Sequence, residues 1–141
     1  MKRILSVFVG LTICTLFAGS NPSENQMTTK ISVKAKGNTT VFELNNSPAA
    51  RDLYAQLPLS ITVENYSNNE KIFYPPKKLN TTDTPLADGG RAGTLAYYAP
   101  WGVVVMFFKG FSSAPGLYEL GHVTSGSENI PEMTGTIQIE K

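Results

Sequence analysis

The sequence predicts a mainly β domain of eight short strands and one short helix, arranged as a small closed barrel or a sandwich. Three observations indicate this class. Apolar and polar residues alternate along several short segments, as in strands that are buried on one face. Turn-forming residues, including 12 glycines and 9 prolines, separate these segments. Only residues 47–57 have the apolar spacing of a helix, so strands dominate the predicted domain.

Residues 1–20 have the pattern of a secretory signal peptide. Two basic residues, Lys2 and Arg3, precede an apolar run over residues 4–17. This run is shorter than the about 20 apolar residues that a membrane-spanning helix needs. Small residues then lead to a predicted cleavage site after Ser20. We therefore expect the protein to be secreted or periplasmic.

Cys14 offers a lesser alternative, in which a lipidated cysteine anchors the protein to a membrane. Ile13 is larger than the residue that usually precedes such a cysteine, so this alternative is less favoured. Cys14 is also the only cysteine of the chain. A single cysteine excludes a disulfide framework and a cysteine-ligated zinc site, and cleavage after Ser20 would also remove the one candidate thiol nucleophile.

Residues 21–29 are polar and are expected to form a disordered lead-in to one domain over residues 30–141. Within this domain, alternation runs from Ile31 to Leu44 and is interrupted by a Gly-Asn pair that is typical of turns. The segment is therefore predicted to form a β-hairpin.

Residues 47–57 are predicted to form the helix. Ser47 can accept a hydrogen bond from a free N–H of the first turn, and Pro48 suits a first helical position, where no N–H is needed. Pro58 ends the helix. The apolar stripe of this helix consists of Ala50, Leu53, Tyr54 and Leu57.

The remaining six strands are predicted at residues 59–64, 71–74, 95–98, 103–108, 117–123 and 135–140. The segment 103–108 has no polar residue, which indicates a strand that is covered on both faces. Residues 77–93 show no periodicity and predict a long loop. Such a loop is either a functional rim or a mobile connection.

The charge balance argues against a nucleic-acid-binding protein. The chain has 12 Lys and Arg residues against 11 Asp and Glu residues, and removing residues 1–20 changes its net charge from +1 to −1. Nucleic-acid-binding proteins normally carry a basic excess. With one histidine and no cysteine left, we also predict no metal site and no cofactor. No stable membrane span is predicted, and the oligomeric state stays open.

The single histidine, His122, is expected to be partly buried and hydrogen-bonded. Alternation along residues 117–123 places it on the same face as Tyr118 and Leu120. A role in ligand binding is the alternative. No serine lies in the sequence context of a hydrolase nucleophile, so a catalytic triad is not predicted.

Large aromatic rings gather within residues 97–101, close to an aromatic pair that includes Phe108. Such rings either line a groove for an apolar or proline-bearing ligand or fill the core. For Trp101 we favour a place in the core, where its ring closes one end of the barrel. Tyr74 and Tyr98 are the better candidates for exposure.

Several motifs together resemble those of the bacterial cyclophilin-like domain proteins, over roughly residues 30–141. The motifs are Ala50 to Leu53 followed by Leu57 to Leu59, Glu70 to Pro75, Gly93 to Gly102, Phe107 to Phe108, and Leu120 to Val123. The resemblance implies an eight-stranded closed β-barrel with a helix at one open end. Members of this family usually carry Asp in place of Thr94 and Arg or Lys in place of His122.

The resemblance does not imply catalysis. True cyclophilins isomerise Xaa-Pro bonds with an arginine in a Phe-His-Arg motif, near a Phe-Met-x-Gln segment, and neither string occurs in this chain. We therefore favour a domain that binds a peptide or a small apolar ligand without turning it over. The residues expected to line its groove are Tyr74, Arg91, Tyr98, Trp101, Phe108 and His122.

Two alternatives stay open. The first is a weak prolyl isomerase in which Arg91 polarises the Xaa-Pro bond. The second is a structural or assembly module that oligomerises through an apolar face.

Overall fold

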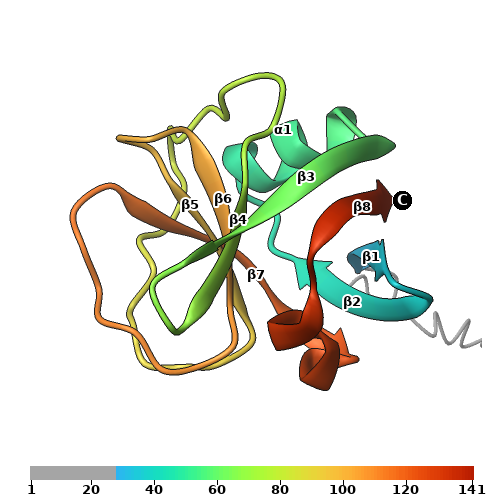
Figure 1. Ribbon diagram of the computed structural model, residues 1–141. Helices are drawn as coiled ribbons and strands as arrows, with labels where there is room; N and C mark the ends of the chain where they lie inside the picture. The colour runs from blue at the N-terminus through green and yellow to red at the C-terminus, as the bar shows by residue number, and fades with distance from the viewer. Residues whose placement is uncertain (1–27) are drawn as a thin grey trace, which may run out of the picture.

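The computed structural model describes residues 28–141, which form a closed barrel of eight strands (Figure 1). The strands are β1 (Thr29–Ala35), β2 (Asn38–Leu44), β3 (Leu59–Tyr66), β4 (Glu70–Phe73), β5 (Thr94–Tyr98), β6 (Val103–Phe107), β7 (Leu117–Ser125) and β8 (Gly135–Glu140). The helices are α1 (Pro48–Ala55) and the 3₁₀ helix η2 (Ser127–Glu132). The predicted mainly β class and closed barrel are confirmed. The predicted signal peptide and most of the lead-in lie outside the described residues.

The strands follow one another around the barrel in the order β1-β2-β7-β5-β6-β4-β3-β8. Antiparallel pairing of β8 with β1 closes the ring. Figure 1 shows α1 and η2 at opposite ends of the barrel. Closure leaves no unpaired edge strand, which is the usual weak point of an open sheet.

The barrel interior is filled by apolar side chains from alternate strand positions. Their exposed fraction is at most 1% for Ile31, Val33, Phe42, Leu95, Met106 and Ile137. Ala49, Ala50 and Leu53 of α1 are fully buried against the same core. The helix therefore covers one end of the barrel with its apolar stripe.

The ends of α1 follow from its flanking residues. The Ser47 hydroxyl accepts a hydrogen bond of 3.2 Å from the Ala50 N–H, and Pro48 begins the helix, as predicted. The helix ends two residues earlier than predicted. The N–H of Gln56 bonds the carbonyl of Leu53 at 3.1 Å, which tightens the last turn.

Strand β6 separates two apolar regions, as the sequence predicted for a strand covered on both faces. Val104 and Met106 point into the barrel, whereas Val103, Val105 and Phe107 point outward. All five residues of β6 are buried. The outward residues belong to a second cluster on the barrel wall, here named the outer cluster, which consists of Ile72, Ala87, Ala96, Val103, Val105, Phe107 and Leu117.

The long segment between β4 and β5 is tied to the barrel by backbone hydrogen bonds. The Ala87 N–H donates to the Leu117 carbonyl at 2.9 Å, and the Glu119 N–H donates to the Pro85 carbonyl at 2.8 Å. Ala87 thereby becomes part of the outer cluster. This segment and residues 108–116 cover the wall of the barrel from outside.

A bulge in β7 changes which side chains point outward. The adjacent β5 residues Leu95 and Ala96 pair with Gly121 and Glu119. Leu120 is therefore an extra residue in β7. The alternation of side chains shifts by one position at such a bulge. Leu120 is fully buried, whereas His122 is exposed. The prediction of a partly buried His122 is therefore wrong, because simple alternation does not include the bulge.

The glycine at position 121 lets β7 and β2 approach each other closely. A Cβ atom placed on Gly121 would lie 2.0 Å from the carbonyl oxygen of Glu43 and 3.0 Å from the Cα atom of Leu44. Any larger residue would push the two strands apart at the bulge.

Trp101 is half exposed, at 50%, and does not close the end of the barrel. It lies in the turn between β5 and β6, outside the barrel, so its predicted place in the core is wrong. Tyr97 is the ring that enters the core at this point, with 1% exposed. Its hydroxyl accepts a hydrogen bond of 3.2 Å from the Leu79 N–H. Tyr74 is exposed and Tyr98 half-buried, as expected for both.

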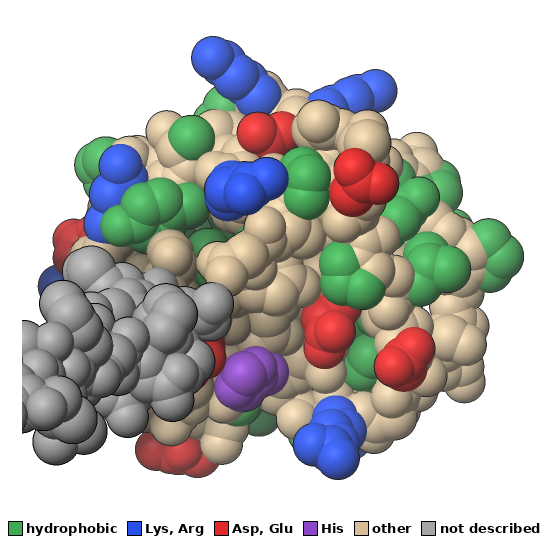
Figure 2. Space-filling model, turned by 180° about the vertical axis from the view of Figure 1, so that it is seen from behind, with side chains coloured by type: hydrophobic (Ala, Val, Ile, Leu, Met, Phe, Trp, Pro, Cys, Tyr) green, Lys and Arg blue, Asp and Glu red, His purple; other side chains and the backbone are tan. Residues whose placement is uncertain are grey.

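The surface carries a mixture of charges. On the face in Figure 2, acidic and basic side chains are interspersed with apolar ones. Lys34 and Glu140 form an exposed ion pair of 2.9 Å between β1 and β8, which contributes at most about 1 kcal/mol. Among residues 28–141, no helix has the length and hydropathy to cross a membrane. Within the same range, no group of three or more His, Cys, Asp and Glu residues is placed to hold a metal ion.

Candidate functional site

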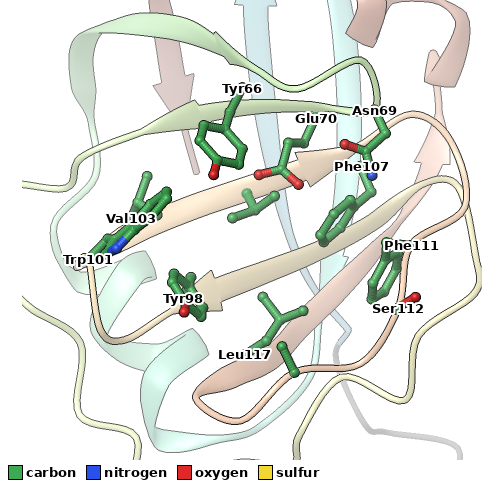
Figure 3. A pocket seen from close by; sticks show the side chains of 12 residues that line it. Tyr66, Asn69, Glu70, Tyr98, Trp101, Val103, Phe107, Phe111, Ser112 and Leu117 are labelled. Carbon is green, nitrogen blue, oxygen red and sulfur yellow. The ribbon is translucent and has the colours of Figure 1, made fainter.

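A groove with a volume of 290 Å³ lies on the barrel wall above the outer cluster (Figure 3). Its lining comes from β3 to β7, from the turns that join β3 to β4 and β5 to β6, and from the loop at residues 108–116. This site is here named the aromatic groove, and its lining residues are Tyr66, Asn69, Glu70, Tyr98, Trp101, Val103, Val105, Phe107, Phe111, Ser112, Ala114 and Leu117.

Strand register brings the groove residues together. Glu70 of β4 pairs with Tyr66 of β3 on one side and with Phe107 of β6 on the other. Directly paired residues point to the same face of a sheet. These three side chains therefore form a row across three strands on the outer face of the barrel.

Aromatic rings form both ends of the groove. The Trp101 ring lies 5.1 Å from the Tyr66 ring and 5.3 Å from the Tyr98 ring, with interplanar angles of 81° and 84°. The rings of Phe107 and Phe111 are stacked at the other end, with centroids 3.8 Å apart. Edge-to-face contact, as at the Trp101 end, is a favourable arrangement of aromatic rings. The aromatic rings at each end of the groove therefore pack against one another.

Glu70 is the one charged residue that lines the groove. Its carboxyl group points into the groove between Tyr66 and Phe107 (Figure 3). Within the described part of the chain it has no salt-bridge partner. Partial burial raises the pKa of Glu70, because the charged form loses hydration.

Asn69 lies next to Glu70 in the lining of the groove. Its side-chain Nδ2 atom donates to the Gly110 carbonyl at 3.3 Å. Its backbone carbonyl accepts from the Phe108 N–H at 3.0 Å. Its Oδ1 atom is buried and has no hydrogen-bond partner. Buried polar atoms usually have a partner, so an unpaired acceptor at a groove requires an explanation.

A separate polar pocket of 320 Å³ lies along β7 and the segment before β5. The Thr94 hydroxyl donates to the Arg91 carbonyl at 3.0 Å and fixes the turn at this pocket. The polar pocket is lined by Arg91, Ala92, Gly93, Thr94, Glu119, His122 and Val123.

Comparison with known proteins assigns the fold to a family. The sequence matches the cyclophilin-like family over residues 33–140. The chain belongs to the cyclophilin-like family. The solution structure of a hypothetical protein from Archaeoglobus fulgidus has a similar fold, with a TM-score of 0.60 and 15% sequence identity. The match covers 80% of this chain and 94% of that chain. No curated protein sequence matches this chain.

The cyclophilin-like barrel places four of the six predicted ligand residues in two separate sites and two outside both. Tyr98 and Trp101 line the aromatic groove, and Arg91 and His122 line the polar pocket. Tyr74 lines neither site. Phe108 also lines neither, because its partly buried ring packs against the barrel core. The predicted set is therefore not one cluster of side chains.

Several groove residues of this cyclophilin-like protein were not predicted from the sequence. Phe107 belongs to the strand predicted to be covered on both faces, and that prediction already indicates an outward-facing apolar position. Tyr66, Asn69 and Glu70 lie where a polar turn joins β3 to β4, and nothing in that segment indicates a site. Phe111 reaches the groove from a loop, through its stack on Phe107.

Proposed function

We propose that this cyclophilin-like protein is a secreted binding domain that holds a peptide or a small apolar ligand in the aromatic groove without chemically changing it. The observation that carries the proposal is Trp101, which is 50% exposed at a concave site and flanked by two tyrosine rings. Large exposed apolar side chains at a concave site are typical of ligand or protein contact surfaces.

The composition of the groove supports binding of an apolar group. Its floor consists of aliphatic side chains of the outer cluster, including Val103 and Val105, and its ends consist of aromatic rings. Tyrosine and tryptophan combine a large apolar area with a polar tip, which suits contact with a ligand that is partly wet. Covering this surface would remove apolar area from water and favour binding by about 25 cal/mol for each Å².

A prolyl-isomerase activity through Arg91 receives less support from the geometry. Arg91 is exposed and lines the polar pocket, whereas the rings that could hold a proline line the aromatic groove. An isomerase assay on the purified protein tests this alternative. Acceleration that disappears in Arg91→Ala would favour the isomerase over the binding domain. Analytical ultracentrifugation at high protein concentration tests the assembly alternative, which requires an oligomer.

Secretion is the second part of the proposal, and it is supported by the basic and apolar pattern of residues 1–20. The mass of the protein recovered from its native host tests it. A chain that begins at residue 21 is expected, whereas a lipid attached to Cys14 would indicate a membrane anchor. An intact chain with Met1 and the apolar segment would contradict cleavage.

The binding site is tested with two matched tyrosine variants. Tyr98→Ala removes a groove ring, whereas Tyr74→Ala removes an exposed tyrosine outside the groove. Using 2-phenylethanol as a probe and amide chemical shifts as the readout, we expect Tyr98→Ala to weaken binding and Tyr74→Ala to leave it unchanged.

Trp101→Ala provides a second groove variant, because this half-exposed side chain lies outside the buried core clusters. Its affinity for the probe should fall while its melting temperature stays near that of the wild type. Unchanged affinity in both groove variants would remove the groove from the proposal.

A further inference from the structure

Glu70 carries the one charge in the lining of the aromatic groove, and this charge is negative. Its carboxylate points into the groove in Figure 3, and the other polar groups of the lining, which are the Asn69 amide, the hydroxyls of Tyr66, Tyr98 and Ser112 and the Trp101 indole N–H, are neutral. No Lys or Arg residue lines the groove. The polar part of the groove therefore complements a group that carries N–H bonds and positive charge.

The orientation of the Asn69 amide is fixed by its neighbour. Its Nδ2 atom donates to the Gly110 carbonyl. If the amide were turned over, Oδ1 would face that carbonyl, and two acceptors would be in contact. The unpaired Oδ1 atom therefore lies beside the groove, closed to solvent, where its partial negative charge adds to that of the Glu70 carboxylate.

The rings at the Trp101 end add a second attraction for positive charge. Tyr66 and Tyr98 both meet Trp101 edge-to-face, so the three rings have different orientations around one end of the groove. Aromatic faces attract ammonium and guanidinium groups, most strongly on tryptophan. The stacked rings of Phe107 and Phe111 offer only apolar contact at the other end.

We propose that the aromatic groove selects an apolar molecule that carries an ammonium or guanidinium group. The cation contacts Glu70, and the apolar part lies against Phe107 and Phe111. This inference rests on the proposed function, since it specifies the ligand of the same groove. The cation has two sources with the same chemistry, namely a free organic amine and a basic side chain next to an apolar residue of a peptide.

The first test compares three probes that share a phenyl ring and differ in charge: 2-phenylethylamine, 2-phenylethanol and 3-phenylpropionate. Binding to the purified protein is followed by amide chemical shifts. The amine is expected to bind about tenfold more tightly than the alcohol, because a hydrogen bond between charged groups is stronger than a neutral one. The carboxylate is expected to bind most weakly. Equal affinities for amine and alcohol would overturn the selection of a cation.

A matched pair of variants locates the charge effect. Glu70→Gln removes the groove carboxylate with little change of shape, and Glu128→Gln makes the same change at an exposed residue of η2 outside the groove. Glu70→Gln should reduce the amine affinity about tenfold and leave the alcohol affinity unchanged. Glu128→Gln should change neither. A tenfold loss of amine affinity in both variants would show that binding depends on the net charge of the protein and not on the groove carboxylate.

A pair of peptides identifies the source of the cation. N-acetyl-Phe-Arg-amide carries a guanidinium, and N-acetyl-Phe-citrulline-amide replaces it with a neutral urea of the same shape. Preference for the arginine peptide indicates a peptide ligand, and preference limited to the free amine indicates a small molecule; both support a cation. If none of the probes shifts a groove resonance, the binding function itself fails. If the alcohol binds as tightly as the amine, only the present inference fails.

Discussion

Replacing Gly121 with alanine is expected to destabilise the barrel by about 3 kcal/mol, at the upper end of the cost of overpacking a well-packed site. The added Cβ atom would lie 2.0 Å from the Glu43 carbonyl oxygen, 2.9 Å from the Glu43 carbonyl carbon and 3.0 Å from the Leu44 Cα atom. All three are backbone atoms of β2, so no side chain can rotate away. Relief requires β2 and β7 to separate by roughly 1 Å, at a point where the Asn45 N–H donates to the Leu120 carbonyl at 2.8 Å.

Thermal unfolding followed by circular dichroism measures this effect. For a domain of this size, about 3 kcal/mol corresponds to a decrease of about 12 °C in the melting temperature. Gly110→Ala is the matched control, because its new Cβ atom would meet only the Gly90 carbonyl, at 3.3 Å. Its melting temperature should stay close to that of the wild type. If the two variants have the same melting temperature, the close approach of β2 and β7 does not require glycine, and the steric reasoning is wrong.

Three further perturbations test other parts of the fold. Ser47→Ala removes the hydroxyl that accepts from the first turn of α1 and should cost about 1 kcal/mol in urea unfolding; an unchanged midpoint would contradict the cap. Leu53→Ala empties a fully buried position between α1 and the barrel and should cost about 2–5 kcal/mol, whereas a loss below about 1 kcal/mol would mean that the helix end is not closely packed. Burial raises the pKa of Glu70 above its ordinary value of 4.5, so its charged form opposes folding, and this cost grows as the pH rises from 4.5 through the folded-state pKa. Glu70→Gln should therefore melt at a higher temperature than the wild type at about pH 7 and at the same temperature at about pH 3.5, and a lower melting temperature at neutral pH would refute the argument.

Most of the fold could be predicted from the sequence because each strand carries its own signal. Alternation locates a strand without information on its partner, and the cap at Ser47 locates the start of α1. The bulge in β7 is different, because it depends on how β7 pairs with β5 and β2. The outward direction of His122 follows from that pairing and is absent from the local pattern.

The candidate site was less predictable because its residues come together only through the register of the barrel. Tyr66 and Phe107 are 41 positions apart in the sequence and lie on either side of Glu70. The aromatic cluster at residues 97–101 lies at the turn between β5 and β6, and two of its rings, Tyr98 and Trp101, line the aromatic groove. It did not indicate on which side of the barrel wall each ring lies, so Trp101 was expected in the core, where Tyr97 lies instead.

The two faces of strand β6 can be substituted separately, because each face packs against a different cluster. Its even-numbered positions, Val104 and Met106, point into the barrel interior, whereas Val103, Val105 and Phe107 form part of the wall of the aromatic groove. The two sets interleave along five consecutive residues, yet they touch different neighbours. Randomising only the odd-numbered positions should therefore produce a library of altered ligand preferences on an unaltered scaffold. The same separation would allow natural relatives to diversify what they bind while keeping one barrel.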